Sequence, residues 1–401
     1  MKRPGMELST SRKAVFTLIA VLLFSGTVEG VARIVWWRLE RDSLRTHYQK
    51  GEAVLANDAI NFMKAPDGIY GYTLRPGFRN PGNTINSQGF RAPADFPIAR
   101  SPESLRIVCL GESTTFGTND ESNYPVFLGR ILDKTAIGYR EYEVINAGVP
   151  GWLSDQIALR VQHQIADLKP DVAVLYVGWN DFQTYDPLRP VASKSSFEAS
   201  FGGKPWMEYA THASRTLALL NGLGQRRPPE YTSEDYTDAA ANSTPPERRY
   251  RFLLRNLGAI VQELRTASPS TRIFVSTLVG MWPQTTSDGK MVVPFWINEH
   301  HVSPDQAAHF VDELNEQLRR FAGERGVGLI DVATIFQPLD RQRLQFDFAH
   351  MYSDGYELMA WTMFDALVSS NIVKARSSGR QRELLSTYRE APSEVKSGGH
   401  P

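Results

Sequence analysis

Residues 107–117 read Ile-Val-Cys-Leu-Gly-Glu-Ser-Thr-Thr-Phe-Gly, a short apolar run followed by a glycine, an acid and a serine. The apolar run is continuous rather than alternating, which predicts a strand buried on both faces. Gly111 allows a sharp turn where that strand ends, so Ser113 is expected at the carboxyl edge of a sheet, where open α/β folds bind ligands. A serine in this place is either a nucleophile with a base nearby or an ordinary turn or helix cap.

Three later stretches favour the nucleophile. They are Asn146-Ala147-Gly148-Val149-Pro150-Gly151, Gly178-Trp179-Asn180-Asp181 and Asp347-Phe348-Ala349-His350, and each adjoins an apolar run. Together they supply a glycine amide, an asparagine amide and an Asp–His pair, which are the parts of a serine hydrolase with an oxyanion hole. In this order and spacing the four stretches resemble the SGNH/GDSL hydrolase family, and the resemblance covers roughly residues 105–370.

The expected catalytic residues are Ser113, His350 and Asp347. A serine hydroxyl is a poor nucleophile until a base takes its proton, and His350 is the expected base. Asp347 stands three residues before that histidine. A carboxylate there can accept a hydrogen bond from the Nδ1–H of the imidazole and leave Nε2 facing the serine.

The oxyanion hole needs donors that are already in place. The backbone N–H of Ser113 is the first expected donor. The resemblance implies the Gly151 N–H as the second, because the family's glycine stands five residues after the asparagine that ends the second strand; Gly148 is the alternative. It implies the side-chain amide of Asn180 as the third, with Asp181 anchoring the loop rather than reacting.

Two positions depart from the family pattern. The family commonly has aspartate before the nucleophile, where this chain has Glu112; a longer acid can still accept hydrogen bonds from loop amides, so activity is expected to survive. The family commonly has a small residue before the asparagine of the third stretch, where this chain has Trp179. That bulk is expected to narrow the neighbourhood of the oxyanion hole and to alter the preferred acyl size.

The composition limits the classes of function. The chain has 401 residues, room for one large domain with appendages, and its 44 basic and 44 acidic residues give no sign of a nucleic-acid surface. The single cysteine, Cys109, excludes an intrachain disulfide and is expected to be a small buried hydrophobe. No Cys/His cluster has the spacing of zinc ligands, so neither a metal nor a cofactor is expected. The oligomeric state is left open.

Residues 1–37 have the features of a membrane anchor. A basic start is followed by an apolar segment from Ala14 to about Val28, and residues 34–37, Ile-Val-Trp-Trp, extend it to a length that can span a bilayer. We therefore expect a cytoplasmic start and a single-pass signal anchor in 1–37, with the catalytic domain on the extracytoplasmic, periplasmic side. The alternative is a cleaved signal peptide, and basic residues on both sides of the segment give little asymmetry to set its orientation.

From residue 105 onward the pattern becomes an alternation of strands and helices. The strand candidates are 106–110, 142–146, 172–177, 271–277 and 327–331, and the helix candidates are about 122–134, 154–168, 248–267, 304–325 and 354–374. Such alternation predicts an α/β fold with a parallel sheet and helices on both faces. The resemblance implies a flavodoxin-like, three-layer hydrolase domain over 105–375.

Three further segments surround or interrupt that domain. Residues 38–104 are expected to be a linker and an N-terminal extension packed on it; their stretch 86–91, Asn-Ser-Gln-Gly-Phe-Arg, is similar to one in membrane-anchored members of the family and is expected to be structural. Residues 182–247 are long, aromatic and punctuated by proline pairs, which indicates either a lid-like insertion or a surface decoration. Residues 376–401 are polar and are expected to be a disordered tail.

The sequence thus predicts a membrane-tethered serine esterase that works through an acyl-Ser113 intermediate on an acyl-ester substrate, an envelope lipid or an acylated glycan. The first alternative is an O-acyltransferase that uses the same site to modify a surface polysaccharide. The second is a non-catalytic envelope scaffold that has kept the fold, since a fold alone does not establish a function.

Overall fold

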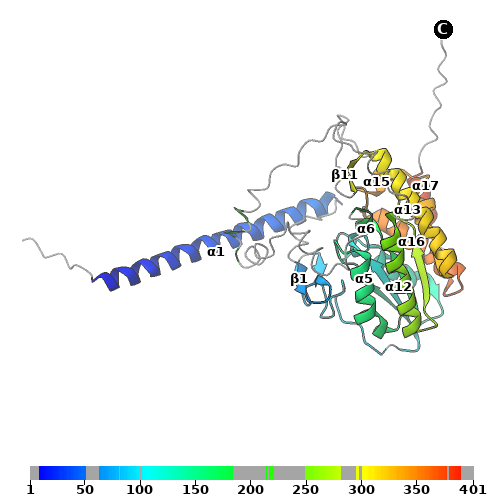
Figure 1. Cartoon of the computed structure of the whole chain (residues 1–401), viewed down its shortest axis with the longest axis horizontal. Helices are drawn as coiled ribbons and strands as arrows, with labels where there is room; N and C mark the ends of the chain where they lie inside the picture. The colour runs from blue at the N-terminus through cyan, green and yellow to red at the C-terminus, as the bar shows by residue number, and fades with distance from the viewer. Residues whose placement is uncertain are drawn as a thin grey trace, which may run out of the picture. The chain divides into compact units, whose positions relative to one another are not determined.

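The computed structural model describes residues 9–50, 63–80, 82–99, 101–183, 214, 216–217, 219–220, 249–280, 295–297, 300–376 and 379–389. The chain divides into two compact units, which are taken separately below (Figure 1). The first comprises Met1–Thr46 and Glu198–Pro229, and the second comprises His47–Phe197 and Glu230–Pro401.

The second unit is built on a five-stranded parallel sheet. Its strands are β5 (Ser104–Gly111), β7 (Glu141–Asn146), β8 (Val172–Tyr176), β9 (Arg272–Ser276) and β12 (Gly328–Ile330). They lie in the order β12-β9-β8-β5-β7, which is the 2-1-3-4-5 order of flavodoxin-like folds. Each predicted strand is therefore present, and Cys109 is fully buried in β5 as predicted.

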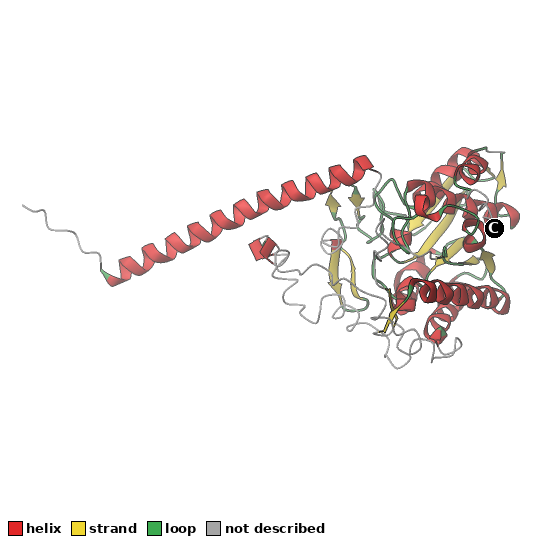
Figure 2. Cartoon of the chain, turned by 90° about the horizontal axis from the view of Figure 1, so that it is seen from above, coloured by secondary structure: helices red, strands yellow, loops and turns green. Residues whose placement is uncertain are grey.

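The main helices pack in two groups. These are α4 (Tyr124–Thr135) with α16 (Ser353–Ser369), and α5 (Ser154–Arg160) with α12 (Arg251–Ala267), which also contacts α13 (Pro304–Arg325). Figure 2 shows helices on both sides of the strands, so the predicted three-layer α/β arrangement is confirmed. The carboxyl ends of β5 and β8 meet at one edge of this sheet, and the chain leaves each strand there in a short helix, α3 (Ser113–Phe116) and α6 (Trp179–Gln183).

Local sequence explains where α13 begins and ends. The Ser303 side chain accepts a hydrogen bond from the Gln306 N–H, and a proline occupies the first turn. Gly326 ends the helix in the left-handed conformation, with φ of 58°. The four apolar side chains predicted to form its core face, Phe310, Leu314, Leu318 and Phe321, are all buried.

The remaining described elements are shorter, apart from α1. They are α1 (Thr10–Lys50), β1 (Lys64–Asp67), β2 (Gly71–Leu74), β3 (Arg79–Asn80), β4 (Asn83–Thr84), β6 (Ala136–Ile137), the π-helix Val161–Ile165, the 3-10 helix Ala166–Leu168, β10 (Phe295–Ile297), β11 (His300–Val302), α14 (Val332–Phe336), α15 (Arg341–Leu344), β13 (Lys374–Ala375) and α17 (Arg380–Thr387).

Two expectations differ from the structure. The helix predicted over 154–168 changes type twice, because the α-helical hydrogen bonds end at Arg160 and π and 3-10 turns follow. The disordered tail predicted from residue 376 does not hold for α17. Arg380 in that helix pairs with Glu357 of α16 through two hydrogen bonds, and Leu384 is buried. Side-chain pairing with α16 therefore orders a segment whose composition is polar; residues 390–401 lie outside the described residues.

In the first unit, α1 contains a stretch, Thr10–Val35, that is long and apolar enough to cross a membrane, with a mean hydropathy of 2.0. Its large apolar side chains, from Val15 to Val35, are exposed. Of the predicted insertion 182–247, most lies outside the described residues; Ser214, Thr216, Leu217, Leu219 and Leu220 are described and belong to this unit.

Candidate active site

The proposed nucleophile lies on the first turn after β5. Ser113 begins α3, and the preceding Gly111 is required there because a Cβ at this position would come within 2.4 Å of the Tyr176 carbonyl oxygen on β8. Thr114 donates a hydrogen bond from its hydroxyl to the Ala349 carbonyl oxygen, 3.1 Å away. The serine turn is thus tied directly to the distant loop that carries the Asp–His pair.

Ser113, His350 and Asp347 form one chain of hydrogen bonds. The Nε2 atom of His350 lies 2.8 Å from Ser113 Oγ, and its Nδ1 atom lies 2.6 Å from Asp347 Oδ2. The other carboxylate oxygen of Asp347 accepts the backbone N–H groups of Ala349 and His350, at 2.8 and 2.7 Å. Ser113 and His350 are 237 positions apart in the sequence, yet the fold brings them and Asp347 together. Their order, serine, histidine, aspartate, is the one that general-base activation of a serine requires.

The electrostatics of Asp347 suit an ionised carboxylate. Burial opposes its charge, but the charge and hydrogen bond of His350 together with the two backbone donors outweigh burial, and the pKa of Asp347 lies below its ordinary value. A carboxylate that stays ionised can hold the proton of the imidazole on Nδ1 and leave Nε2 as the acceptor toward Ser113. The ring of Phe346 stacks on that imidazole at 5.6 Å and restricts its rotation.

The carboxyl end of the serine turn is held by two residues that sequence reasoning did not assign to the site. The Asn146 amide donates to the carbonyl oxygens of Thr115 and Phe116, at 3.0 and 3.2 Å. Arg91 donates to the carbonyl oxygens of Phe116 and Gly117, at 2.8 and 3.1 Å, and its guanidinium lies 3.9 Å from the centre of the Phe116 ring. A cation at this end of α3 satisfies carbonyl groups that the short helix leaves without partners.

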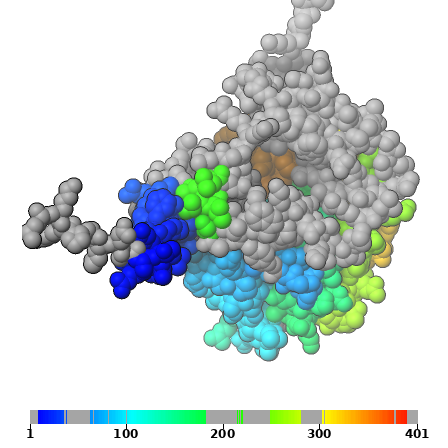
Figure 3. All heavy atoms as spheres, turned by 60° about the vertical axis from the view of Figure 1, so that its left-hand side comes forward, coloured from blue at the N-terminus to red at the C-terminus, as the bar shows by residue number. Residues whose placement is uncertain are grey.

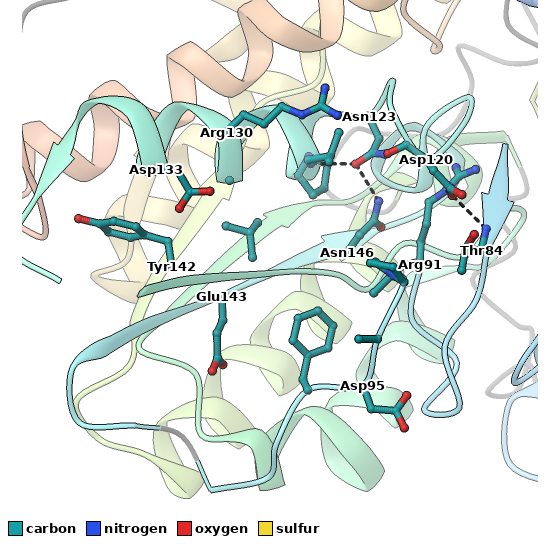
Figure 4. A pocket seen from close by; sticks show the side chains of 18 of the residues that line it. Thr84, Arg91, Asp95, Asp120, Asn123, Arg130, Asp133, Tyr142, Glu143 and Asn146 are labelled. Carbon is teal, nitrogen blue, oxygen red and sulfur yellow. Dashed lines mark hydrogen bonds and ion pairs between the residues drawn. The ribbon is translucent and has the colours of Figure 1, made fainter. Parts of the chain in front are cut away.

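Arg91 reaches the turn from the N-terminal extension. It is nearly fully buried and pairs with Asp120, and burial, only partly offset by that aspartate, lowers its pKa to about 10. Figure 4 shows Arg91, Asp120 and Asn146 in the wall of a cavity of about 580 Å³ between the segment 91–97, α4 and β7. Ser113 is not among the residues lining this cavity. Arg91, the last residue of the stretch 86–91, meets the serine turn at its carboxyl end, through the carbonyl oxygens of Phe116 and Gly117.

The loop after β8 is organised around Glu112. One oxygen of this carboxyl accepts the Gly178 N–H at 2.9 Å, and the nearby N–H groups of Trp179 and Asn180 favour its charged form. The longer acid therefore accepts an amide of this loop, as expected. Burial first, and then the charge of Asp181, raise its pKa well above the ordinary value.

The three expected oxyanion donors are placed as follows. Ser113 and its N–H begin α3. Asn180 begins the loop helix α6 with Trp179, and its Nδ2 donates to the Trp152 carbonyl oxygen at 2.8 Å, which fixes the plane of the amide. Gly151 is exposed and has φ of 81°. The alternative donor, the Gly148 N–H, already donates to Asn146 Oδ1 at 3.0 Å, which favours Gly151.

Trp179 does not stand open to the site. Its side chain is 2% exposed and its ring meets that of Phe348 edge to face at 5.7 Å, while its Nε1 donates to Tyr176 Oη. The ring contact joins the loop of Asn180 to the loop of Asp347 and His350. The expected effect of the Trp179 bulk on the neighbourhood of the oxyanion hole and on the preferred acyl size stays a prediction.

Asp181 anchors its loop, as expected. Its two carboxyl oxygens accept the backbone N–H and the hydroxyl of Ser154 at the start of α5. Burial, and to a lesser degree the neighbouring Asp155, outweigh these bonds and raise the pKa of Asp181 to about 7.

This raised pKa predicts a pH-dependent stability. A carboxyl whose folded pKa lies above its unfolded value stabilises fully below the unfolded pKa of 3.8, and that contribution is lost as the pH rises through about 7. Replacing Asp181 with asparagine removes the buried charge, so the Tm of the variant relative to the parent should rise from pH 5 to pH 8 by on the order of 5 °C. Thermal unfolding at the two pH values measures this. A Tm difference that is the same at both would contradict the assignment.

Among the described residues, no group of three or more His, Cys, Asp or Glu side chains is placed to hold a metal ion.

Comparison with known proteins places the same residues in a family. Residues 109–358 match the model of the GDSL-like lipase/acylhydrolase family. No curated protein sequence matches the chain.

Three solved structures are among those to which the chain is similar. One is a lipase/acylhydrolase from Enterococcus faecalis, with 18% identity over 68% of this chain and 100% of that chain and a TM-score of 0.39. Another is an acetylxylan esterase from Geobacillus stearothermophilus, with 13% identity over 67% and 94% and a TM-score of 0.38. A gut microbial diltiazem-metabolizing enzyme has 15% identity over 67% of this chain and a TM-score of 0.40, and the chain spans 48% of its length.

Proposed function

This chain belongs to the GDSL-like lipase/acylhydrolase family, and from that premise we propose that it is a serine esterase that cleaves carboxylic esters through an acyl-Ser113 intermediate. The observation that carries the proposal is the hydrogen-bonded series Ser113 Oγ, His350, Asp347, with distances of 2.8 and 2.6 Å. A nucleophile, a base and an orienting acid within hydrogen-bond reach are the geometric signature of covalent acyl transfer.

Each residue has a step in the proposed reaction. His350 Nε2 takes the proton of Ser113 as Oγ attacks the ester carbonyl, and Asp347 stabilises the imidazolium that forms. The negative charge on the tetrahedral oxygen is met by the N–H groups of Ser113 and Gly151 and by the Asn180 amide. His350 then gives its proton to the departing alcohol. His350 then takes a proton from a water molecule as the water oxygen attacks the acyl carbon. It returns that proton to Ser113 Oγ as the bond between Oγ and the acyl carbon breaks, which releases the carboxylic acid and restores the serine.

Covalent labelling tests the nucleophile. A fluorophosphonate reacts with a serine only when a base has activated it, so the purified protein should carry one label on the peptide that contains Ser113, measured by mass spectrometry. The variant Ser113→Ala should lose the label while keeping its fold. Labelling of another serine, or no labelling of folded protein, would sink the assignment.

The acyl group has two possible acceptors in this mechanism. An O-acyltransferase would form the same acyl-Ser113 intermediate and pass it to a sugar hydroxyl, so labelling does not separate it from an esterase. The two activities are separated by measuring the release of free acid in water, with and without an added polysaccharide acceptor. A non-catalytic scaffold is disfavoured by family membership and by the contact of His350 with both of its partners.

We further propose that α1 anchors the protein in a membrane, with the catalytic domain on the extracytoplasmic side and an envelope lipid or acylated glycan as its substrate. Support comes from the length and mean hydropathy of Thr10–Val35, 2.0, and from the exposure of its apolar side chains. Protease added to intact spheroplasts of an expressing bacterium should degrade the catalytic domain, as seen on an immunoblot. Digestion only after lysis would place that domain in the cytoplasm.

A further inference from the structure

The glycine proposed as an oxyanion donor lies in a tight turn. Trp152 donates its N–H to the Val149 carbonyl oxygen at 3.2 Å, which closes a four-residue turn with Pro150 second and Gly151 third. Proline at the second place and φ of 81° at the third are the features of a type II turn. A Cβ on Gly151 would lie 2.7 Å from Tyr72 Oη, so the close approach of Tyr72 requires glycine as well.

Tyr72 fixes the central peptide of this turn. It lies on β2, is fully buried, and donates its hydroxyl to the Pro150 carbonyl oxygen at 2.9 Å. The Trp152 indole donates back to the Tyr72 carbonyl oxygen at 3.0 Å. The turn and the β1–β2 hairpin of the N-terminal extension are therefore joined by one bond in each direction.

The direction of the Gly151 N–H follows from planarity. In a trans peptide the carbonyl and the N–H point in opposite directions, and the carbonyl of the Pro150–Gly151 peptide points at Tyr72. The N–H of Gly151 must then point away from Tyr72. In a type II turn this central peptide can flip with little change elsewhere, so a bond to its carbonyl is what holds the N–H in one direction.

We propose that Tyr72 is a positioning residue for the oxyanion hole, holding the Pro150–Gly151 peptide so that the Gly151 N–H meets the developing charge. This rests on the proposed serine esterase function. Preorganised donors act on the transition state more than on the bound ester. Loss of the hydroxyl should therefore affect kcat and leave KM nearly unchanged.

The variant Tyr72→Phe tests this, because it removes one hydroxyl and keeps the buried ring. With a small acyl ester, kcat should fall about tenfold with KM within about twofold, and affinity for a boronic acid that forms a tetrahedral adduct should fall by a similar factor. Tyr70→Phe is the matched control, since the Tyr70 ring packs on the same Trp152 at 5.3 Å; its kcat should stay at the parent value.

The possible failures are distinguishable. The positioning role of Tyr72 would be contradicted if Tyr72→Phe kept the parent kcat and boronate affinity, or if only its KM changed. The esterase proposal would still stand in that case, provided that a phosphonate labels Ser113. Absence of that labelling in the parent protein would instead remove the proposed function itself.

A second inference concerns the first unit and starts from a carboxylate in the apolar helix. Glu29 lies within the stretch proposed to span the membrane, and Arg33 one turn later pairs with it at 3.0 Å. It also accepts hydrogen bonds from the Ser214 hydroxyl at 2.7 Å and from the N–H and hydroxyl of Thr216, at 3.2 and 3.0 Å. A carboxylate in a membrane segment is costly unless it is paired, and here residues of the insertion supply part of the pairing.

The residues next to these donors are apolar and exposed. Leu217 and Leu220 are 45% and 59% exposed, whereas Ala32, one turn from Glu29 on α1, is 6% exposed. Figure 3 shows the described insertion residues, in green, against the blue atoms of α1. On α1, Val28 and Val31, which flank Glu29 in the sequence, are exposed apolar residues as well.

We infer that the segment containing Ser214, Thr216, Leu217 and Leu220 docks on α1 at Glu29 and enters the bilayer there, with its leucines toward lipid. The exposed leucines of this segment would contact lipid at the boundary between headgroups and acyl chains, because the segment is hydrogen-bonded to a helix proposed to span the membrane. The inference rests on that proposed span.

Fluorescence in vesicles tests the location. Cys109 is the single cysteine and is buried, so a thiol-reactive environment-sensitive dye reports only on an introduced cysteine. The full chain is reconstituted in phosphatidylcholine–phosphatidylglycerol vesicles with the dye at Leu217→Cys or Leu220→Cys. Both should be quenched by lipids that carry a spin label on the acyl chain. Two other positions serve as references. The dye at Leu22→Cys reports on the membrane-spanning part of α1, and the dye at Ile98→Cys, where the side chain is 71% exposed, reports on a position in water.

Each result separates the two claims. Quenching at Leu22 without quenching at Leu217 and Leu220 would contradict the entry of this segment into the bilayer but support the membrane span of α1. A dye at Leu217 with blue-shifted emission and no quenching would show that protein rather than lipid covers this position, which would also contradict entry into the bilayer. No quenching at Leu22 would remove the span. Adding Glu29→Ala should lower quenching at Leu217 to the level of Ile98, since the docking contact is lost.

Discussion

Replacing His350 with alanine should lower kcat for a small acyl ester by on the order of 10³-fold or more, with little change in KM. His350 contacts both Ser113 and Asp347, at 2.8 and 2.6 Å, so its loss removes the base for the serine and isolates the acid from the reaction. The residual rate would come from binding and from the oxyanion donors alone. Steady-state kinetics on the purified variant measures the effect.

A matched control separates this from general damage. His309 is a histidine whose side chain is 61% exposed and which contacts Glu313 on its own helix, so His309→Ala should keep the parent kcat. Phosphonate labelling of Ser113 should slow in His350→Ala to the same degree as turnover, because both reactions use the same base. Near-normal turnover in His350→Ala would refute the triad.

The sheet and the order of the chemical stretches were accessible from the sequence because both depend on local patterns. The continuous apolar run of β8 predicts a strand buried on both faces, and all five of its residues are buried. The start of α13 follows from Ser303 and the proline after it. These signals lie within a few residues of the features that they predict, so a single sequence contains them.

The supports of the site depend on contacts that no local pattern encodes. Tyr72 meets Pro150 across 78 positions and Thr114 meets Ala349 across 235, and nothing near either residue names its partner. Arg91 stands in a stretch that sequence analysis marked as structural, but only the fold shows that it reaches the carbonyl oxygens of the serine turn. The ring of Trp179 likewise turns toward Phe348 and Tyr176, contacts that its place before Asn180 in the sequence does not indicate.

Replacing Asn180 with alanine should lower kcat by roughly 10²–10³-fold with little change in KM, because its amide acts mainly on charge that develops in the transition state. The bond from Nδ2 to the Trp152 carbonyl oxygen, 2.8 Å long, fixes the amide plane and so aims its second N–H before substrate arrives. A donor that needs no reorganisation is worth more in the transition state than one that must turn. Steady-state kinetics with a small acyl ester gives both constants.

The control must remove a buried amide of equal size that has no proposed part in the reaction. Asn256 is 6% exposed and donates from its Nδ2 to Ser154 Oγ at 2.9 Å, within the network that anchors Asp181. Asn256→Ala should therefore lower Tm but keep the kcat of the folded protein. Asn180→Ala should lower kcat even at temperatures where the variant is fully folded. A rise in KM with kcat preserved in Asn180→Ala would make this amide a substrate-binding group and leave the oxyanion to the Ser113 and Gly151 N–H groups.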